Sequence, residues 1–317
     1  MNQNKMKITS FDAEETGCFG DVLSHAPEHR PLSVGMLGLG YFEYWRMYPA
    51  LERQVSEDLD KAAGLLAGAL PECKVIYPGM VDTLDRAETA GSAFRDAQID
   101  VLVVIAGTYL PDFITMHAIN QIQTHPEVIL FSTQTGNDVN PDDNYIATMR
   151  NSALIAMTQL SGSFRKMKLD YHTVVGEIGD PSAYRRIAGL TAARSAAKRL
   201  KKSTYGLVGH VFRGMYDLEF DRSKVKGFLG PEVMTIQAEH LVEQWRAVPD
   251  AETAVESERL FRRFQVKNIE LDDVKRSVRL GLAMRGLYRK FNLDGLCFLG
   301  QHDIEKMTGA PARMGAS

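Results

Sequence analysis

Two kinds of segment alternate along the chain: short apolar runs, and longer segments in which apolar and polar positions are mixed. The short runs lie at 32–39, 74–77, 101–105, 128–131, 171–176, 205–209, 232–236 and 295–299. Several of them, such as VLVVI at 101–105, show no polar alternation, which is typical of strands buried on both faces of a parallel sheet. The longer segments predict helices at 49–70, 82–98, 111–124, 142–164, 183–200, 251–264 and 271–291. Strands that alternate with helices predict an α/β fold with right-handed crossovers.

The length of the chain predicts more than one domain, because 317 residues exceed the roughly 150 that one domain usually takes. We expect a polar N-terminal arm at 1–31, a first domain at 32–170 and a second domain at 171–317. Each domain should be a doubly wound parallel-sheet sandwich of the flavodoxin-like or Rossmann-like kind. The arm would either pack on a neighbouring subunit or fray. The sequence stops at RMGAS just as another element begins, so we expect a chain truncated before a further domain.

Composition favours small-molecule or protein partners. The net charge of −3 gives no bulk electrostatic reason to expect nucleic acid or an anionic membrane. Three widely spaced cysteines indicate neither a disulfide framework nor a cysteine-based zinc site. The first residues lack the apolar core of a signal peptide, and no apolar run approaches the roughly 20 residues of a membrane span. We therefore expect a cytoplasmic protein.

The segment after the first strand invites two interpretations. Gly38-Leu-Gly40 begins like a dinucleotide-binding turn, but bulky YFEYW at 41–45 replaces the third glycine, which argues against a nicotinamide cofactor. Aromatic rings with one carboxylate, Glu43, instead suit a sugar, because rings pack on its apolar faces while the carboxylate accepts hydroxyl hydrogens. The alternative is that these rings belong to the core or to a subunit contact.

Further polar side chains follow other strands. STQTGN at 132–137 carries hydroxyl and amide groups that suit sugar hydroxyls, or else it is ordinary turn chemistry. His210, Arg213, Met215 and Asp217 follow the strand at 205–209. His302 is the only histidine that lies with carboxylates near a strand end, so the sequence predicts no complete metal site within this chain.

The order of these features resembles the L-arabinose isomerase and L-fucose isomerase superfamily, and more closely its arabinose isomerase branch. The motifs that carry the likeness are AGTYLP at 106–111, LFSTQTGND at 130–138, Asn151-Ser, VVG at 174–176, YGLVGHVFRGMYD at 205–217 and DGLCFLG at 294–300. The resemblance implies an aldose–ketose isomerase that moves a proton through an enediolate, with a divalent metal, typically manganese (Mn²⁺), polarising the carbonyl.

The resemblance also implies substrate-binding roles for particular residues. Gln134 and Met215 would line the substrate pocket, with Glu43, Tyr109 and, in the loop at 300–302, His302 as further substrate-binding residues. Arabinose isomerases carry His-Thr-Gln where this chain has STQ at 132–134, and a Gln-His pair in place of the aromatic segment, so the sugar itself is not specified.

The catalytic machinery implied by the resemblance would lie further along the protein. The acid/base carboxylates and the metal ligands are expected beyond Ser317, the last residue of the chain. This chain alone would therefore hold no metal and show no catalysis.

Three hypotheses follow. The first is a sugar isomerase that forms a homo-oligomer, a trimer or hexamer by resemblance, because the family completes its site between subunits. The second is a carbohydrate-binding or regulatory module without catalysis. The third, a nicotinamide-dependent enzyme, would have to bind NAD(H) at the loop after Gly40.

Overall fold

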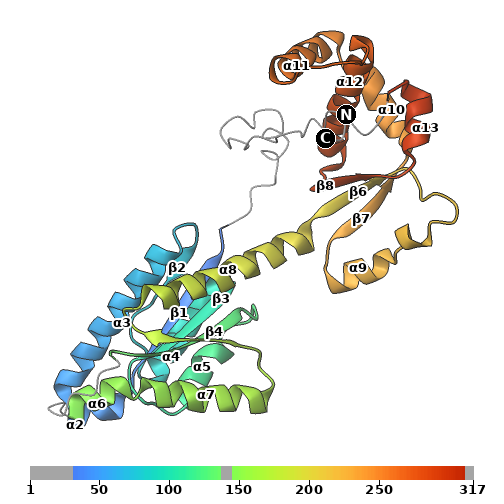
Figure 1. Ribbon diagram of the computed structural model, residues 1–317. Helices are drawn as coiled ribbons and strands as arrows, with labels where there is room; N and C mark the ends of the chain where they lie inside the picture. Colours follow the sequence, from blue (N-terminus) through green and yellow to red (C-terminus); the bar gives the residue numbers. More distant parts are fainter. Residues whose placement is uncertain (1–30, 137–144, 311–317) are drawn as a thin grey trace, which may run out of the picture. The chain divides into compact units, whose positions relative to one another are not determined.

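The computed structural model of the protein describes residues 31–136 and 145–310 (Figure 1). The chain divides into two units, and the boundary between them falls between Ala197 and Lys198. We call residues 31–197 the N-terminal domain and residues 198–310 the C-terminal domain. The expected arm at 1–31 lies, apart from its last residue, outside the described residues. The end of the chain, from 311 to Ser317, also lies outside them, so the expectation of a truncated chain with catalytic carboxylates beyond Ser317 stays a prediction.

Five parallel strands form the sheet of the N-terminal domain, in the order β2-β1-β3-β4-β5. Their bounds are β1 Ser33–Leu39, β2 Lys74–Ile76, β3 Val101–Ala106, β4 Glu127–Gln134 and β5 His172–Glu177. Every residue of β1 and β3 is buried, which confirms the expectation drawn from their continuous apolar runs. This is the flavodoxin-like order, and the direction of winding reverses between β1 and β3, where such sheets bind their ligands.

Helices cover both faces of this sheet (Figure 1). One face packs against α3 (Pro49–Ala69), α6 (Tyr145–Asn151) and α8 (Pro181–Lys202). The other face packs against α4 (Leu84–Asp96), α5 (Phe113–Asn120) and α7 (Ala153–Met167). Alternate residues of β3 enter the two cores, Val103 on the α3 side and Val104 on the α4 side. The α/β fold class with doubly wound parallel sheets is thereby confirmed.

The first domain is longer than expected. β5 pairs in parallel with β4, with Phe131 opposite Val174, so it completes the first sheet instead of starting the second. α8 then packs back onto the same sheet through Ala183, Tyr184 and Ile187. The boundary expected after residue 170 therefore moves to Ala197, inside α8. The reason is that β4 gains its second hydrogen-bonded neighbour from the strand that the sequence order assigned to the next domain.

Three parallel strands form the sheet of the C-terminal domain, in the order β7-β6-β8. β6 spans Thr204–Val208, β7 spans Glu232–Ile236 and β8 spans Gly295–Phe298. This order repeats that of β2-β1-β3, so the winding reverses between β6 and β8. One sheet face packs against α10 (Ala238–Ala247), α12 (Leu271–Phe291) and α13 (Gln301–Thr308), while α11 (Asp250–Arg263) packs on α12.

Several local expectations need correction. The helix expected at 142–164 is two helices, because the chain turns at Ser152 between α6 and α7. The hydrophobic pattern did not predict α2 (Phe42–Met47), α9 (Arg222–Phe228) or α10, and neither α2 nor α9 has a buried residue that would produce such a pattern. Within the described ranges, no helix is long and apolar enough to cross a membrane.

Candidate functional site

The carboxyl ends of β1, β3 and β4 lie beside one another in the first sheet, and three of the predicted substrate residues follow them. Glu43 lies in α2 just after β1, Tyr109 lies in the loop after β3, and Gln134 is the last residue of β4. Because parallel strands end at the same edge, the topology places all three on one edge of the N-terminal domain. We call this the switch-point edge.

Tyrosine rings gather at the switch-point edge. Tyr41 and Tyr44 stack edge to face with their centroids 5.3 Å apart, and Tyr48 lies 4.8 Å from Tyr145 of α6. Burial raises the pKa of Tyr44, and the neighbouring phenols of Tyr145, Tyr109 and Tyr41 raise it further. We call these five residues the tyrosine cluster. Tyr145 is exposed and the other four are half-buried. Each can therefore offer part of its apolar ring, together with its hydroxyl group, to a ligand.

Trp45 behaves differently from these tyrosines, because it is fixed into the fold. Its indole Nε1 donates to Asp82 Oδ2 at 2.7 Å, and Asp82, only 3% exposed, also accepts from Arg86 Nη1 at 3.0 Å. A Cβ on Gly40 would lie 2.8 Å from both Trp45 and Met80 Sδ. The core interpretation therefore holds for Trp45, and the space where a dinucleotide pyrophosphate would approach Gly40 is filled.

Asp82 is the first residue of the helix expected at 82–98, where a cap would stand, but it does not cap that helix. The N-cap of α4 is Thr83, whose Oγ1 accepts from the backbone N–H of Arg86 at 3.4 Å. Asp82 lies one residue earlier and turns inward to Trp45. A buried carboxylate needs charged or hydrogen-bonding partners, and two long side chains supply them here.

Hydrogen bonds to α7 hold Tyr109 in place. Its backbone N–H donates to Ser152 Oγ at 2.8 Å, and its hydroxyl donates to Gln159 Oε1 at 2.9 Å. Gln159 Nε2 in turn donates to Asp112 Oδ1 at 3.0 Å. The Tyr109 ring is therefore positioned by both ends, while its hydroxyl oxygen keeps the capacity to accept a further hydrogen bond.

Hydrogen bonds hold the start of the loop after β4, at Gln134 and at Thr135. The Gln134 carbonyl accepts from the backbone N–H of Ile178 at 2.9 Å. Thr135 donates to Asn151 Oδ1 from its backbone N–H at 2.9 Å and from its hydroxyl at 2.7 Å. Asn151 thus anchors the loop, a role that only the fold reveals. Asn137, the last residue of the predicted polar segment, lies outside the described residues.

Glu43 remains accessible at this edge. Its side chain is 44% exposed, and its carboxylate lies 3.8 Å from Arg46 Nη1, a weak pair one turn along α2. Since an exposed pair at this distance contributes little, the carboxylate can accept hydrogen bonds from a ligand at small cost.

The other two predicted residues, Met215 and His302, lie at the corresponding edge of the C-terminal sheet. Met215 is 41% exposed in the loop after β6, and His302 is exposed in the first turn of α13 after β8. The loop after β6 contacts the loop after β8. Gly209 lies so close to the carbonyl oxygen of Leu299 that a side chain at position 209 would not fit. Each domain therefore presents its own candidate residues at its own carboxyl edge.

Among the residues that the structure describes, no three His, Cys, Asp or Glu side chains lie close enough together to hold a metal ion. His302, Asp303 and Glu305 lie close in sequence but form no such group. The donor set that the isomerase resemblance implies for manganese is thus not provided by the described part of the chain, and its expected place beyond Ser317 stays a prediction.

In comparisons with known proteins, no family model and no curated protein sequence matched the chain.

Proposed function

We propose that the switch-point edge binds a sugar, as the substrate-recognition part of an aldose–ketose isomerase similar to L-arabinose and L-fucose isomerases. The observation that carries the proposal is that the tyrosine cluster, Gln134 and Glu43 all lie at the same carboxyl edge of a sheet wound in the flavodoxin-like order. Sheets of this kind bind their ligands where the winding reverses, which here is between β1 and β3.

The chemistry of the edge suits a neutral polyhydroxylated ligand. A sugar ring has apolar C–H faces that pack on tyrosine rings, and hydroxyl groups that need both donors and acceptors. Gln134 can donate and accept, Glu43 accepts, and the phenols of the half-buried tyrosines do either. The carboxylate of Glu43 stands next to Arg46, so no strong unbalanced charge is built on α2.

The proposed roles are binding and orientation. Tyr109 and Tyr44 would face the sugar ring, and Gln134 and Glu43 would hold its hydroxyls. Proton transfer between the first two carbons, the manganese ion and the homo-oligomer are implied by the resemblance, and we assign none of them to a residue described above.

Sugar binding is tested first by calorimetric titration of the full chain with pentoses and 6-deoxyhexoses. Gln134→Ala should weaken binding about fivefold, because one lost hydrogen bond is worth about 1 kcal/mol. Gln123→Ala is the matched control, since exposed Gln123 lies before β4, at the opposite edge of the sheet. Failure of every sugar to bind, or equal losses in the two variants, contradicts the proposal.

Aldose-to-ketose conversion of the bound sugar, with and without manganese, then separates two functions. Conversion that depends on manganese supports an isomerase. Binding without conversion, in both this chain and protein made from its full natural reading frame, instead supports a carbohydrate-binding module.

A further inference from the structure

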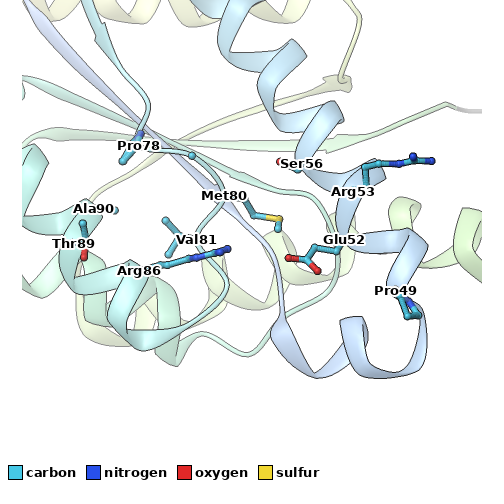
Figure 2. A pocket seen from close by; sticks show the side chains of 11 residues that line it. Pro49, Glu52, Arg53, Ser56, Pro78, Met80, Val81, Arg86, Thr89 and Ala90 are labelled. Atoms are coloured by element: carbon cyan, nitrogen blue, oxygen red, sulfur yellow. The ribbon is translucent and has the colours of Figure 1, made fainter.

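A separate cavity of about 660 Å³ opens at the carboxyl end of β2, next to the loop at 78–81 (Figure 2). Its walls come from the start of α3, from this loop and from the first turns of α4. The volume falls in the range of small-molecule sites, about 300–1,000 Å³. The cavity also adjoins the carboxyl end of β1, since Val81 pairs with Leu39 there. None of the proposed sugar-binding residues lines it.

The floor of the cavity is apolar and its rim is charged. Met80, Val81 and Ala90 are buried and form the floor. In Figure 2, Glu52 and Arg86 extend toward one another across the opening, while the Arg53 side chain points away from it. An apolar floor between a cation and an anion fits a ligand with a flat apolar face, an anionic group and hydroxyl groups.

Arg86 is oriented for anion binding by a residue beneath it. Its Nη1 donates to Asp82 Oδ1 at 3.0 Å, and the Asp82 side chain is only 4% exposed. Guanidinium has five N–H donors, and the Arg86 side chain remains 55% exposed, so further donors face solvent. A guanidinium already fixed in direction loses less entropy when it binds a phosphate with its planar fork.

We propose that this cavity binds a phosphorylated ring compound, a sugar phosphate or a nucleoside monophosphate. The phosphate is held by Arg86, the ring lies on Met80 and Val81, and a ligand hydroxyl donates to Glu52. The two sources share this chemistry, and titration with AMP and with glucose 6-phosphate distinguishes them. This cavity shares no lining residue with the residues proposed to hold the neutral sugar.

The fluorescence of Trp45 can report on binding at Arg86, because both side chains donate hydrogen bonds to Asp82. Trp45 and Arg86 donate to the two oxygens of the same carboxylate. A phosphate bound to Arg86 places negative charge beside this group and so changes the field at the Trp45 indole. The chain has two tryptophans, so Trp245→Phe leaves Trp45 as the sole emitter.

The experiment titrates the Trp245→Phe chain with AMP, glucose 6-phosphate and inorganic phosphate, following Trp45 emission, with calorimetry on the wild-type chain. At least one ring compound should saturate the signal and bind about tenfold or more tightly than inorganic phosphate, because the apolar floor contributes only to the former. Whichever of AMP and glucose 6-phosphate binds more tightly identifies the source.

Two variants complete the test. Arg86→Lys keeps a cation beside Asp82 but removes the planar fork, so affinity should fall about tenfold with the domain still folded by circular dichroism. Arg53→Gln is the matched control and should change affinity less than twofold. The proposal is overturned if neither ring compound binds, if inorganic phosphate binds as tightly as they do, or if the two variants lose affinity equally. A failure here leaves neutral-sugar binding at Gln134 untouched, so the two proposals fail separately.

Discussion

Gly209 joins β6 to the loop that carries Met215, and replacing it with alanine should loosen the C-terminal domain. Its φ is +87°, and a Cβ there would overlap the carbonyl oxygen of Leu299. That carbonyl cannot move freely, because the backbone N–H of Leu299 donates to Val208 O at 2.7 Å. Relief of the overlap therefore disturbs the pairing at the carboxyl end of β6 and β8.

The cost has two parts. A positive φ costs an alanine about 1 kcal/mol relative to glycine. Displacing the Leu299 peptide weakens its hydrogen bond to Val208, which is worth about 1 kcal/mol, and adds steric strain of a similar size. We expect Gly209→Ala to lower the free energy of unfolding of the C-terminal domain by about 3 kcal/mol.

Gly214 provides the control, because it has a φ of +88° but nothing lies within 4 Å of the Cβ position. Gly214→Ala should cost only the conformational part, about 1 kcal/mol. Urea unfolding is followed by the fluorescence of Trp245, which packs on the C-terminal core, in a Trp45→Phe background. With an m-value of about 2 kcal/mol/M, the midpoints should differ by about 1 M. Equal midpoints for the two variants would refute the steric argument.

Two further predictions concern the N-terminal domain. Arg150 donates to both oxygens of Asp58 at 2.9 and 2.8 Å, and Arg150→Met should destabilise the domain by about 1–2 kcal/mol because a half-buried carboxylate loses its partner. Urea unfolding followed at Trp45 measures this loss, and adding Asp58→Asn should recover part of it; a single variant as stable as wild type contradicts the prediction. Burial raises the pKa of Tyr184, whose hydroxyl donates to Ile178 O at 2.8 Å. As the pH rises above about 10, the unfolded chain loses the Tyr184 proton before the folded chain does, so this stabilisation is present at neutral pH and declines in alkali. The stability difference between wild type and Tyr184→Phe should therefore shrink between pH 8 and pH 11, and a constant difference would show that the phenol is not protected.

The local pattern of the sequence was enough to predict most strands and the α/β class. A run such as 101–105 is apolar on both faces, and only a sheet covered on both sides buries it, so the prediction depends on no long-range contact. The resemblance singled out Glu43, Tyr109 and Gln134, and the structure places them at one edge because the carboxyl ends of parallel strands meet there.

Tertiary structure alone decided which sheet β5 joins. Its residues Thr173 and Val175 are exposed, so its composition does not identify a neighbour, and only the pairing with β4 assigns it. The turn at Ser152 likewise depends on a partner far along the chain, since its hydroxyl accepts from the N–H of Tyr109.

The role of Asp82, too, could not be predicted from the local sequence. By sequence it stands where a helix cap belongs, but its partner Trp45 lies 37 residues away. A local rule weighs only neighbouring backbone N–H groups, whereas the fold buries this carboxylate and supplies an indole and a guanidinium to satisfy it. Periodic patterns therefore determine the elements, while hydrogen bonds between distant side chains depend on how those elements pack.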